Sequence, residues 1–537
     1  MSTEPSSSSS RPLNRGAACL PCRKLKAKCD GNKPACGRCI ANHRPDDCEY
    51  ATGAEVTRSR LLEENIALLE ARIRELENPG EVAPSVQLYD LGRQPAAPST
   101  SRTQSHGPAI ALYPAGMVQP AVHVPDPTPQ EVQVLIQTFM LHAYQLGLFL
   151  TPARLRAQGS HVNAGSSALM SAVLLWGSRL SSSSTLRNRE AYFADSATQA
   201  ISATTMPTQA GSPGQDVLCT IQAEVLLANY FFATGRLLEG RYHCLAAVAL
   251  ITGSRFHQLD PSNLGRDPVA AGERIRAFWT VVNIDKAWAA AMNTPPSIAQ
   301  FGRAAIRVTT PWPLPSEAYD QGIVVPRHGG NYSMEDYVRG AVDDSNEDFS
   351  PLAIRAKAAA LYDRAIYVSS QYRVDMPNRN DFLNYFNSLD SKIERFHRQL
   401  VAVKDRRPDD MREVLVSRTF ACAAAIQLHA VFSSTQPMSW KKTICVAVSA
   451  SRALDIVDIN QYPHLDPVIA ILWSTICKVL ITEMDRVKHG ATPAQEDLAG
   501  VTLSLDKIMA TMGVLSTTCP LMGTHLAEIH QARVPLN

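Results

Sequence analysis

Six cysteines within a stretch of thirty residues constrain this chain more than any other feature. Their spacing is C-x2-C-x6-C-x6-C-x2-C-x8-C, and they are Cys19, Cys22, Cys29, Cys36, Cys39 and Cys48. A C-x2-C pair places two sulfurs on one turn, so both can reach a single metal ion at about 2.3 Å. Because a tetrahedral zinc takes four ligands, six thiolates fill two sites only if two of them bridge both ions.

The spacing resembles that of the fungal zinc-cluster transcription factors. The likeness includes the intervening Arg23, Lys26, Lys28 and Asp30, and the dipeptide Lys33-Pro34, which shapes the loop between the two halves. It implies two zinc ions per chain. In the family the first and fourth cysteines bridge the ions. This implies one zinc on Cys19, Cys22, Cys29 and Cys36, and the other on Cys19, Cys36, Cys39 and Cys48.

Two other roles for the cysteines fit less well. A disulfide framework requires a secretory context, and the N-terminal MSTEPSSSSSRP has no apolar segment of a signal peptide. A redox C-x-x-C motif belongs next to a βαβ pattern, and this region is too small for one. The six other cysteines stand among apolar neighbours and are expected to be small buried residues, as in a reducing compartment; they are Cys219, Cys244, Cys422, Cys445, Cys477 and Cys519.

Basic residues crowd the segment between the second and third cysteines. Arg23, Lys24, Lys26 and Lys28 lie there without an acidic residue among them. Such a run is often only a solvated face, but here metal ligands on both sides would fix its direction. Cations held in this way suit phosphates and the guanine edge in the major groove of DNA.

The resemblance assigns roles to these cations. In the family a short helix follows the second cysteine and presents its end to the major groove. The residue that reads bases corresponds to Lys26, and the family's half-sites are CGG-like. Arg23, Lys24 and Lys28 then contact phosphate, with Arg15 flanking the cluster. Leu25 stands where relatives often carry a basic residue.

Composition divides the rest of the 537 residues. We predict a small zinc-stapled α/loop DNA-binding module, a short parallel coiled coil, a disordered linker and then a large all-α domain. The expected boundaries are 1–14 disordered, 15–50 zinc cluster, 51–58 linker, 59–78 coiled coil, 79–127 Pro-rich disordered linker and 128–530 all-α regulatory domain.

A heptad pattern predicts the coiled coil. Its apolar positions alternate at spacings of four and three residues; they are Leu62, Ile66, Leu69, Ile73 and Leu76. Ile at a and Leu at d favour a parallel two-stranded coil, hence a homodimer. The alternative is an amphipathic helix packed on its own domain, but the linkers on both sides isolate the segment.

The region after residue 128 is expected to be all-α. Thr128, Pro129 and Glu131 form a capping box at its start, and a Ser391…Glu394 box begins a later apolar stripe of Leu389, Ile393, Phe396 and Leu400. Loops are expected at 253–272, 293–350 and 404–412. No apolar run is expected to span a membrane.

This region resembles the fungal-specific transcription factor domain, the middle homology region of the same family. The likeness rests on two segments, 226–230 with 246–250 beyond it, and 273–279 with Asp285 beyond it. For Arg274, Arg276, Trp279 and Asp285 we expect a structural role, an ion pair beside a core aromatic ring.

We expect no enzyme, because no P-loop, G-x-S-x-G, H-E-x-x-H or G-x-G-x-x-G motif occurs. An acidic loop with Asp343, Asp344, Glu347 and Asp348 either recruits a coactivator or is simply solvated. The function expected is a nuclear, zinc-dependent, sequence-specific regulator of RNA polymerase II transcription that binds CGG-like half-sites as a dimer. Its α-domain would hold coregulators or a small-molecule effector. The alternative is an interaction scaffold whose zinc cluster is purely structural.

Overall fold

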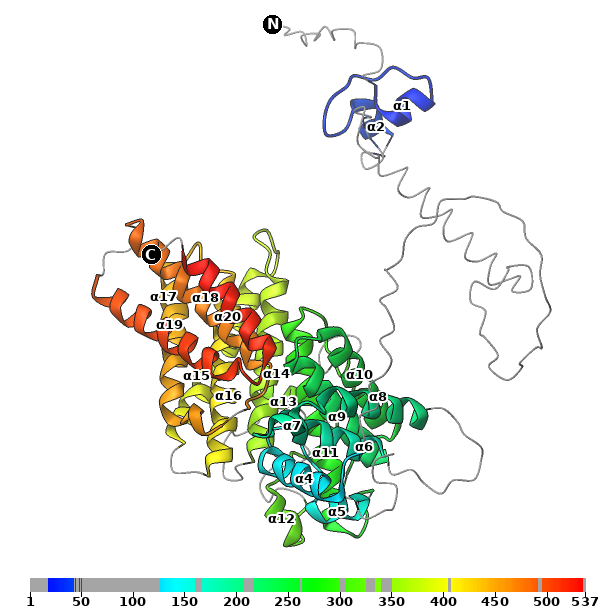
Figure 1. Ribbon diagram of the computed structural model, residues 1–537. Coiled ribbons are helices and arrows are strands. Elements are labelled where there is room, and N and C mark those ends of the chain that lie inside the picture. Colours follow the sequence, from blue (N-terminus) through cyan, green and yellow to red (C-terminus); the bar gives the residue numbers. More distant parts are fainter. Residues whose placement is uncertain are drawn as a thin grey trace, which may run out of the picture. The chain divides into compact units, whose positions relative to one another are not determined.

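The computed structural model describes residues 18–42, 44, 48, 50, 126–159, 167–205, 217–260, 263–299, 306–324, 334–339, 350–403, 407–462, 464–490 and 495–534. The chain divides into two compact units, residues 1–116 and 117–537, and each is described by itself (Figure 1). The predicted coiled coil 59–78, the linkers 51–58 and 79–125, Arg15 and the acidic loop 343–348 lie outside the described residues. They stay predictions.

The described part of the first unit holds two short helices, α1 (Leu20–Lys24) and α2 (Gly37–Ala41), which contact each other. Their buried residues are cysteines, Cys19, Cys22, Cys36 and Cys39. The described part of this unit contains no apolar core besides this cluster, which agrees with a fold organised by metal ligands.

The second unit is helical throughout its described part, without a strand. Its first half contains α4 (Pro129–His142), α5 (Pro152–Gly159), α6 (Ala168–Arg179), α7 (Ser184–Arg187), α8 (Glu190–Thr205), α9 (Val217–Ala233), α10 (Leu237–Gly253), η2 (Phe256–Gln258), α11 (Pro268–Ala291), α12 (Ser316–Asp320) and α13 (Met334–Arg339). Its second half contains α14 (Pro351–Gln371), α15 (Arg379–Ala402), α16 (Pro408–Ala430), α17 (Pro437–Arg452), η3 (Ala453–Ile456), η4 (Ile459–Gln461), α18 (Ile469–Lys488), α19 (Gln495–Leu515) and α20 (Pro520–Arg533).

The predicted capping box opens α4. The Thr128 side chain accepts a hydrogen bond from the Glu131 backbone N–H at 3.2 Å, and the Glu131 carboxylate accepts one from the Thr128 N–H at 2.8 Å. Two N–H groups that a helix start leaves without partners are thereby satisfied.

Other predicted boundaries were wrong. The stripe of Leu389, Ile393, Phe396 and Leu400 is buried as expected, but α15 begins at Arg379, so Ser391 lies inside the helix and caps nothing. Phe382 and Phe386 continue the buried stripe toward the N-terminus and extend the helix. Helices α11 and α16 likewise begin within segments that were predicted to be loops. Those segments also contain three short helices, α12, α13 and η2.

Helices α4 and α6 cross at close range because of a glycine. A Cβ atom at Gly177 would lie 2.2 Å from the Leu135 carbonyl oxygen. Around such crossings the core is dense with aromatic residues, including the fully buried Trp176, Trp279 and Trp288. Helix α14 packs on both α11 and α16, which joins the two halves of this unit into one core (Figure 1).

One helical stretch, Leu498–Leu515 in α19, is long and apolar enough to cross a membrane by length and composition, which the sequence expectation had excluded. Its Val501, Leu505 and Met512 are buried, and α19 packs on α17, α18 and α20, as a core helix does. Five of the six cysteines outside the cluster are buried as expected. Cys445 on α17 is exposed, which corrects that expectation.

Candidate metal centre and nucleic-acid interface

Each C-x2-C pair is built on the first turn of a short helix. Cys19 is the N-cap of α1 and Cys22 lies at its third position; Cys36 is the N-cap of α2 and Cys39 lies at its third position. N-cap and third-position side chains meet on one face of a helical turn. The spacing therefore points both sulfurs of each pair toward the contact between the two helices.

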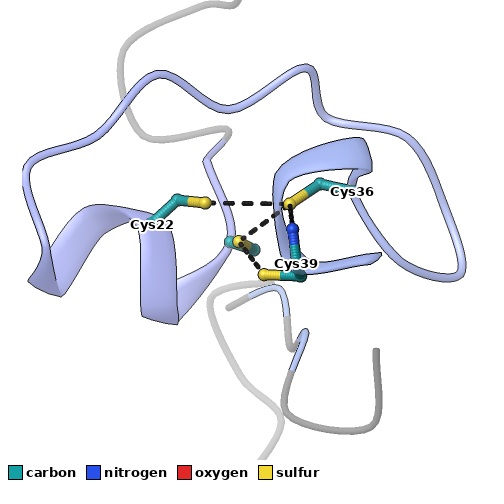
Figure 2. Close-up of side chains that lie close together, drawn as sticks. Cys22, Cys36 and Cys39 are labelled. Carbon is teal, nitrogen blue, oxygen red and sulfur yellow. Dashed lines mark hydrogen bonds between the residues drawn. The ribbon is translucent and has the colours of Figure 1, made fainter. Parts of the chain in front are cut away.

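The sulfurs gather at distances that suit shared metal ions. Cys19 Sγ lies 3.7 Å from Cys36 Sγ, 3.8 Å from Cys39 Sγ and 3.8 Å from Cys29 Sγ. Cys22 Sγ lies 3.7 Å from Cys36 Sγ (Figure 2). Zn–S bonds of about 2.3 Å in a tetrahedron place neighbouring sulfurs about 3.8 Å apart, so these residues fit zinc.

The remaining cysteines lie at the edge of this group. Cys29 and Cys48 are half-buried, whereas the four cysteines of the C-x2-C pairs are buried. Cys48 Sγ accepts a hydrogen bond from the Cys36 backbone N–H at 3.1 Å, which places it beside Cys36. All six predicted ligands are thus brought together.

Thiolates held together in this cluster require a bound cation to balance their charge. Burial raises the pKa of both Cys19 and Cys22. At Cys36, burial also acts to raise the pKa, but the Cys39 backbone N–H and the neighbouring thiols outweigh it and lower the pKa to about 6. Adjacent buried thiolates repel one another, so they persist together only when bound metal ions balance their charge.

Two residues outside the cysteine pattern support the site. The Asp30 carboxylate accepts hydrogen bonds from the Gly37 N–H at 2.9 Å and the Asn32 side-chain amide at 3.1 Å. The Tyr50 hydroxyl donates to the Asn32 carbonyl at 2.8 Å and lies 3.9 Å from Cys29 Sγ. Sequence reasoning noted Asp30 only as part of the resemblance and gave Tyr50 no role, because neither belongs to the cysteine pattern.

The basic segment surrounds the C-terminal end of α1. Arg23, Lys24, Lys26 and Lys28 are all exposed. The resemblance implied a helix that follows the second cysteine. Helix α1 instead begins at Leu20 and therefore contains that cysteine. Arg23 and Lys24 occupy the last turn, where cations interact favourably with the helix dipole.

Lys26 stands at a special backbone position. Its φ of 48° lies in the left-handed region. Its N–H donates to the Arg23 carbonyl at 3.2 Å, and the Ala27 N–H donates to the Cys22 carbonyl at 2.9 Å. This pair of hydrogen bonds is a Schellman motif with Lys26 at the position usually held by glycine. The motif turns the chain sharply at Lys26, immediately beyond the helix.

In the helical unit, two of the residues singled out from the sequence, Trp279 and Asp285, have structural contacts. Trp279 is buried, donates to the Pro311 carbonyl at 2.6 Å and stacks on Trp312 at 4.4 Å. The buried Asp285 pairs with Arg241 at 2.8 Å. The partner lies on α10, which corrects the expectation of an ion pair between Asp285 and Arg274 or Arg276. Those two arginines donate to backbone carbonyls instead.

Family comparisons identify the two parts. Residues 17–54 match the family model of the fungal Zn(2)-Cys(6) binuclear cluster domain. Residues 136–317 match that of the fungal specific transcription factor domain. The cluster domain binds two zinc ions, in agreement with the sulfur geometry described above. No solved structure matches the chain.

Two curated relatives are similar in sequence. The Notoamide biosynthesis cluster transcriptional coactivator notQ' of Aspergillus versicolor is 27% identical over 347 residues, 59% of this chain and 61% of the relative. An uncharacterized transcriptional regulatory protein of Saccharomyces cerevisiae is 52% identical over 44 residues, 8% of this chain and 7% of the relative. The chain thus spans about three fifths of the first relative's length and a small part of the second. The chain thus combines a region that matches the fungal Zn(2)-Cys(6) binuclear cluster domain with a region that matches the fungal specific transcription factor domain.

Proposed function

We propose that this protein is a transcription regulator that binds CGG-like half-sites in duplex DNA as a homodimer and controls RNA polymerase II transcription in the nucleus. The observation that carries the proposal is the exposed basic segment, which surrounds the end of α1 and lies between the buried Cys22 and the half-buried Cys29. A purely structural zinc cluster, the alternative, has no need of four cations fixed in this way.

Within the cluster, one zinc is held by Cys19, Cys22, Cys29 and Cys36 and the other by Cys19, Cys36, Cys39 and Cys48. The support is that Cys19 Sγ lies 3.8 Å from both Cys29 Sγ of the first set and Cys39 Sγ of the second. Cys36 Sγ lies 3.7 Å from Cys22 Sγ of the first set, and the Cys36 N–H donates to Cys48 Sγ of the second at 3.1 Å. Bridging by these two cysteines lets six ligands complete two tetrahedra.

Lys26 reads bases in this proposal, and Arg23, Lys24, Lys28 and Arg15 contact phosphates. The support is positional, because the Schellman turn directs the chain away from the helix axis at Lys26. Lysine suits the O6 and N7 acceptors of guanine, which the major groove exposes.

Dimerisation through residues 59–78 sets the distance between half-sites. The ten residues 49–58 join each cluster to the coil. A flexible ten-residue chain spans about 17 Å on average and at most about 33 Å. Two such arms separate the clusters by roughly 35 Å, or on the order of ten base pairs at 3.4 Å each, with about twenty as the upper limit.

The test is selection of duplexes from a random pool by the full-length, zinc-loaded protein. We expect recovery of paired CGG-like elements within that range of spacing, with affinity that falls steeply as salt rises. Recovery of no preferred sequence, with only salt-dependent binding to any duplex, would favour the structural scaffold instead.

A further inference from the structure

A cavity of about 170 Å³ lies in the helical unit, among the end of α4, helices α9, α11, α12, α14 and α16, and the loops before α14 and α18. Drug-sized ligands occupy roughly 300–1,000 Å³, so this cavity suits a smaller molecule. A second cavity of about 360 Å³ adjoins it and shares Arg276 and Ser316 with it. Arg276 therefore stands where the two spaces meet.

Three buried amide side chains in the wall of the first cavity each have an oxygen without a hydrogen-bond partner among the described residues. They belong to Gln145, Asn229 and Asn283, and less than a tenth of the surface of each residue is exposed. Buried carbonyl oxygens normally accept a hydrogen bond. Three exceptions in one cavity wall indicate a missing donor.

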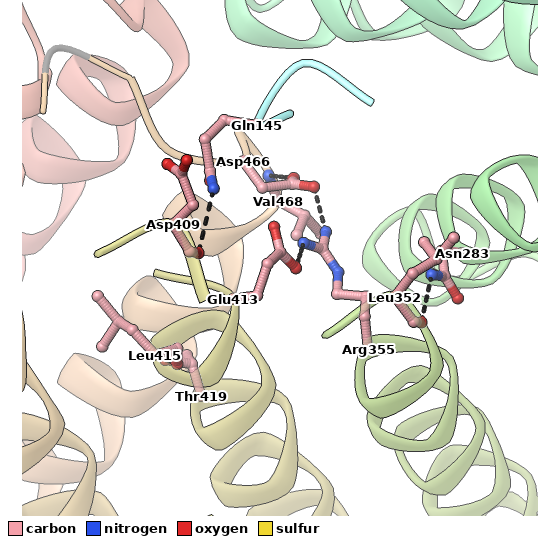
Figure 3. Close-up of polar contacts among 10 residues, drawn as sticks. All are labelled: Gln145, Asn283, Leu352, Arg355, Asp409, Glu413, Leu415, Thr419, Asp466 and Val468. Atoms are coloured by element: carbon pink, nitrogen blue, oxygen red, sulfur yellow. Dashed lines mark hydrogen bonds and ion pairs between the residues drawn. The ribbon is translucent and has the colours of Figure 1, made fainter. Parts of the chain in front are cut away.

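The orientation of these amides is fixed by their nitrogens. The Asn229 amide donates to the Leu146 carbonyl at 3.0 Å. The Asn283 amide donates to the Leu352 carbonyl at 3.4 Å, and the Gln145 amide donates to the Asp409 carbonyl at 3.5 Å (Figure 3). Flipping any amide would bring two oxygens together. The unpaired groups are therefore acceptors, and a ligand must supply N–H or O–H donors.

Arg276 adds a positive charge to the same wall. The other two arginines there already pair with carboxylates: Arg355 pairs with Glu413 at 3.2 Å and with Asp466 (Figure 3), and Arg407 pairs with Glu317 at 2.9 Å. Arg276 donates to the Leu148 carbonyl at 3.1 Å and forms no ion pair with a described carboxylate. The nearby Glu273 is already bound to Arg154 at 2.8 Å.

We propose that this cavity binds a small carboxylate-bearing metabolite with several N–H or O–H donors, such as a polar amino acid or a polyhydroxy acid. Its carboxylate pairs with Arg276, and its donors bond to the oxygens of Asn283, Asn229 and Gln145. Arg276 and Asn283 lie seven residues apart on α11, about 10 Å along its axis, so the anionic group and the donors stand at opposite ends of the ligand. Binding here is independent of the DNA contacts proposed above.

The test is thermal unfolding of the full chain without DNA, followed by tryptophan fluorescence. All six tryptophans lie after residue 128, so the signal reports the helical unit alone. The probes are L-glutamine and D-gluconate, with hexanoate as an acid without extra donors and xylitol as donors without an acid. We expect L-glutamine or D-gluconate to raise Tm saturably, on the order of 3 °C at 100 times Kd. Hexanoate and xylitol should bind at least tenfold more weakly.

Three variants decide whether the site is the one described. Arg276→Gln should abolish the Tm shift, and Arg276→Lys should retain most of it. Arg274→Gln is the matched control, because Arg274 lies on the same helix but donates to the carbonyls of Leu264 and Ala270. The proposal is overturned if neither acid shifts Tm, or if Arg276→Gln responds as the unmodified protein does.

Discussion

The Sγ atoms of Cys19 and Cys36 lie 3.7 Å apart although the residues are seventeen positions apart in the chain and cap different helices. Each of them neighbours at least two other sulfurs of the cluster. In the proposed ligand sets these two sulfurs bridge the ions, so the loss of either cysteine should have the greatest effect on zinc binding.

Replacing a bridging cysteine should remove both zinc ions. We expect elemental analysis of the purified protein to give two zincs per chain, close to none for Cys19→Ser or Cys36→Ser, and about one for Cys48→Ser. Cys445→Ser is the matched control, since that exposed cysteine lies on α17, outside the cluster. Equal zinc contents for Cys36→Ser and Cys48→Ser would contradict the bridging arrangement.

A substitution at Lys26 can separate the effect on folding from the effect on base recognition. A non-glycine residue in the left-handed region costs roughly 1 kcal/mol, so Lys26→Gly should keep or slightly increase the stability of the turn. It should nevertheless weaken binding to the preferred duplex by about 1–3 kcal/mol and relax the preference at particular bases. Competition binding against single-base variants measures both effects.

Lys28→Ala is the comparison for a phosphate contact. It should weaken binding to all sequences alike and make the log–log salt slope shallower by about 0.9. If Lys26→Gly instead leaves the ranking of duplexes unchanged, Lys26 contacts phosphate and another residue reads the bases.

The sequence was most informative where chemistry requires a fixed spacing. The cysteine pattern located all six sulfurs of the cluster, and the capping box located the start of α4. Prediction from the sequence failed where tertiary packing determines the structure. The Ser391…Glu394 pattern is indistinguishable from a helix start until Phe382 and Phe386 are seen to be buried. The acceptors around Arg276 come from the turn after α4, from α9 and from α11, and no local pattern links them.

Gly177 should be irreplaceable by alanine. A Cβ atom there would lie 2.2 Å from the Leu135 carbonyl oxygen, and backbone of another helix cannot move aside as a flexible side chain can. We expect Gly177→Ala to lower the free energy of unfolding of the helical unit by at least about 2 kcal/mol. Urea unfolding followed by tryptophan fluorescence measures this.

Gly500 provides the control for that substitution. It lies within α19, and a Cβ atom there would meet nothing within 4 Å. Gly500→Ala should therefore stabilise the same unit by roughly 0.5–1 kcal/mol, because alanine is the better helix former. Similar effects from both substitutions would show that the α4–α6 crossing is not as close as described.

Ile66→Lys tests the proposed dimer. A charge at an a position of the heptad should split the coil and reduce binding to paired half-sites to weak single-site binding. Glu64→Lys places the same charge outside the predicted a and d positions and should bind paired sites as before. Sedimentation and duplex binding follow the two outcomes. If Ile66→Lys still bound paired sites at full strength, the dimer contact would have to lie in the helical unit.

His464 should make the helical unit less stable in mild acid. Its side chain is buried against Trp176, with ring centroids 5.0 Å apart, and neither ring nitrogen has a hydrogen-bond partner among the described residues. Burial lowers the pKa of His464 to about 3, helped by Arg179, His142 and Arg412 and opposed by Asp466. The unfolded chain, with a histidine pKa of about 6.5, then binds the extra proton between these two values.

The pKa of His464 is lower in the folded chain than in the unfolded chain. The contribution of the neutral His464 to the free energy of unfolding is therefore complete above pH 6.5 and is lost as the pH falls toward 3. Between pH 7.5 and 5.5 this loss amounts to about 1.4 kcal/mol. His464→Phe keeps an aromatic ring against Trp176 and removes the titration. Urea unfolding followed by tryptophan fluorescence should therefore show the unmodified protein losing about 1.4 kcal/mol more than His464→Phe over this interval. Equal losses would mean that His464 gains a proton without leaving its buried site.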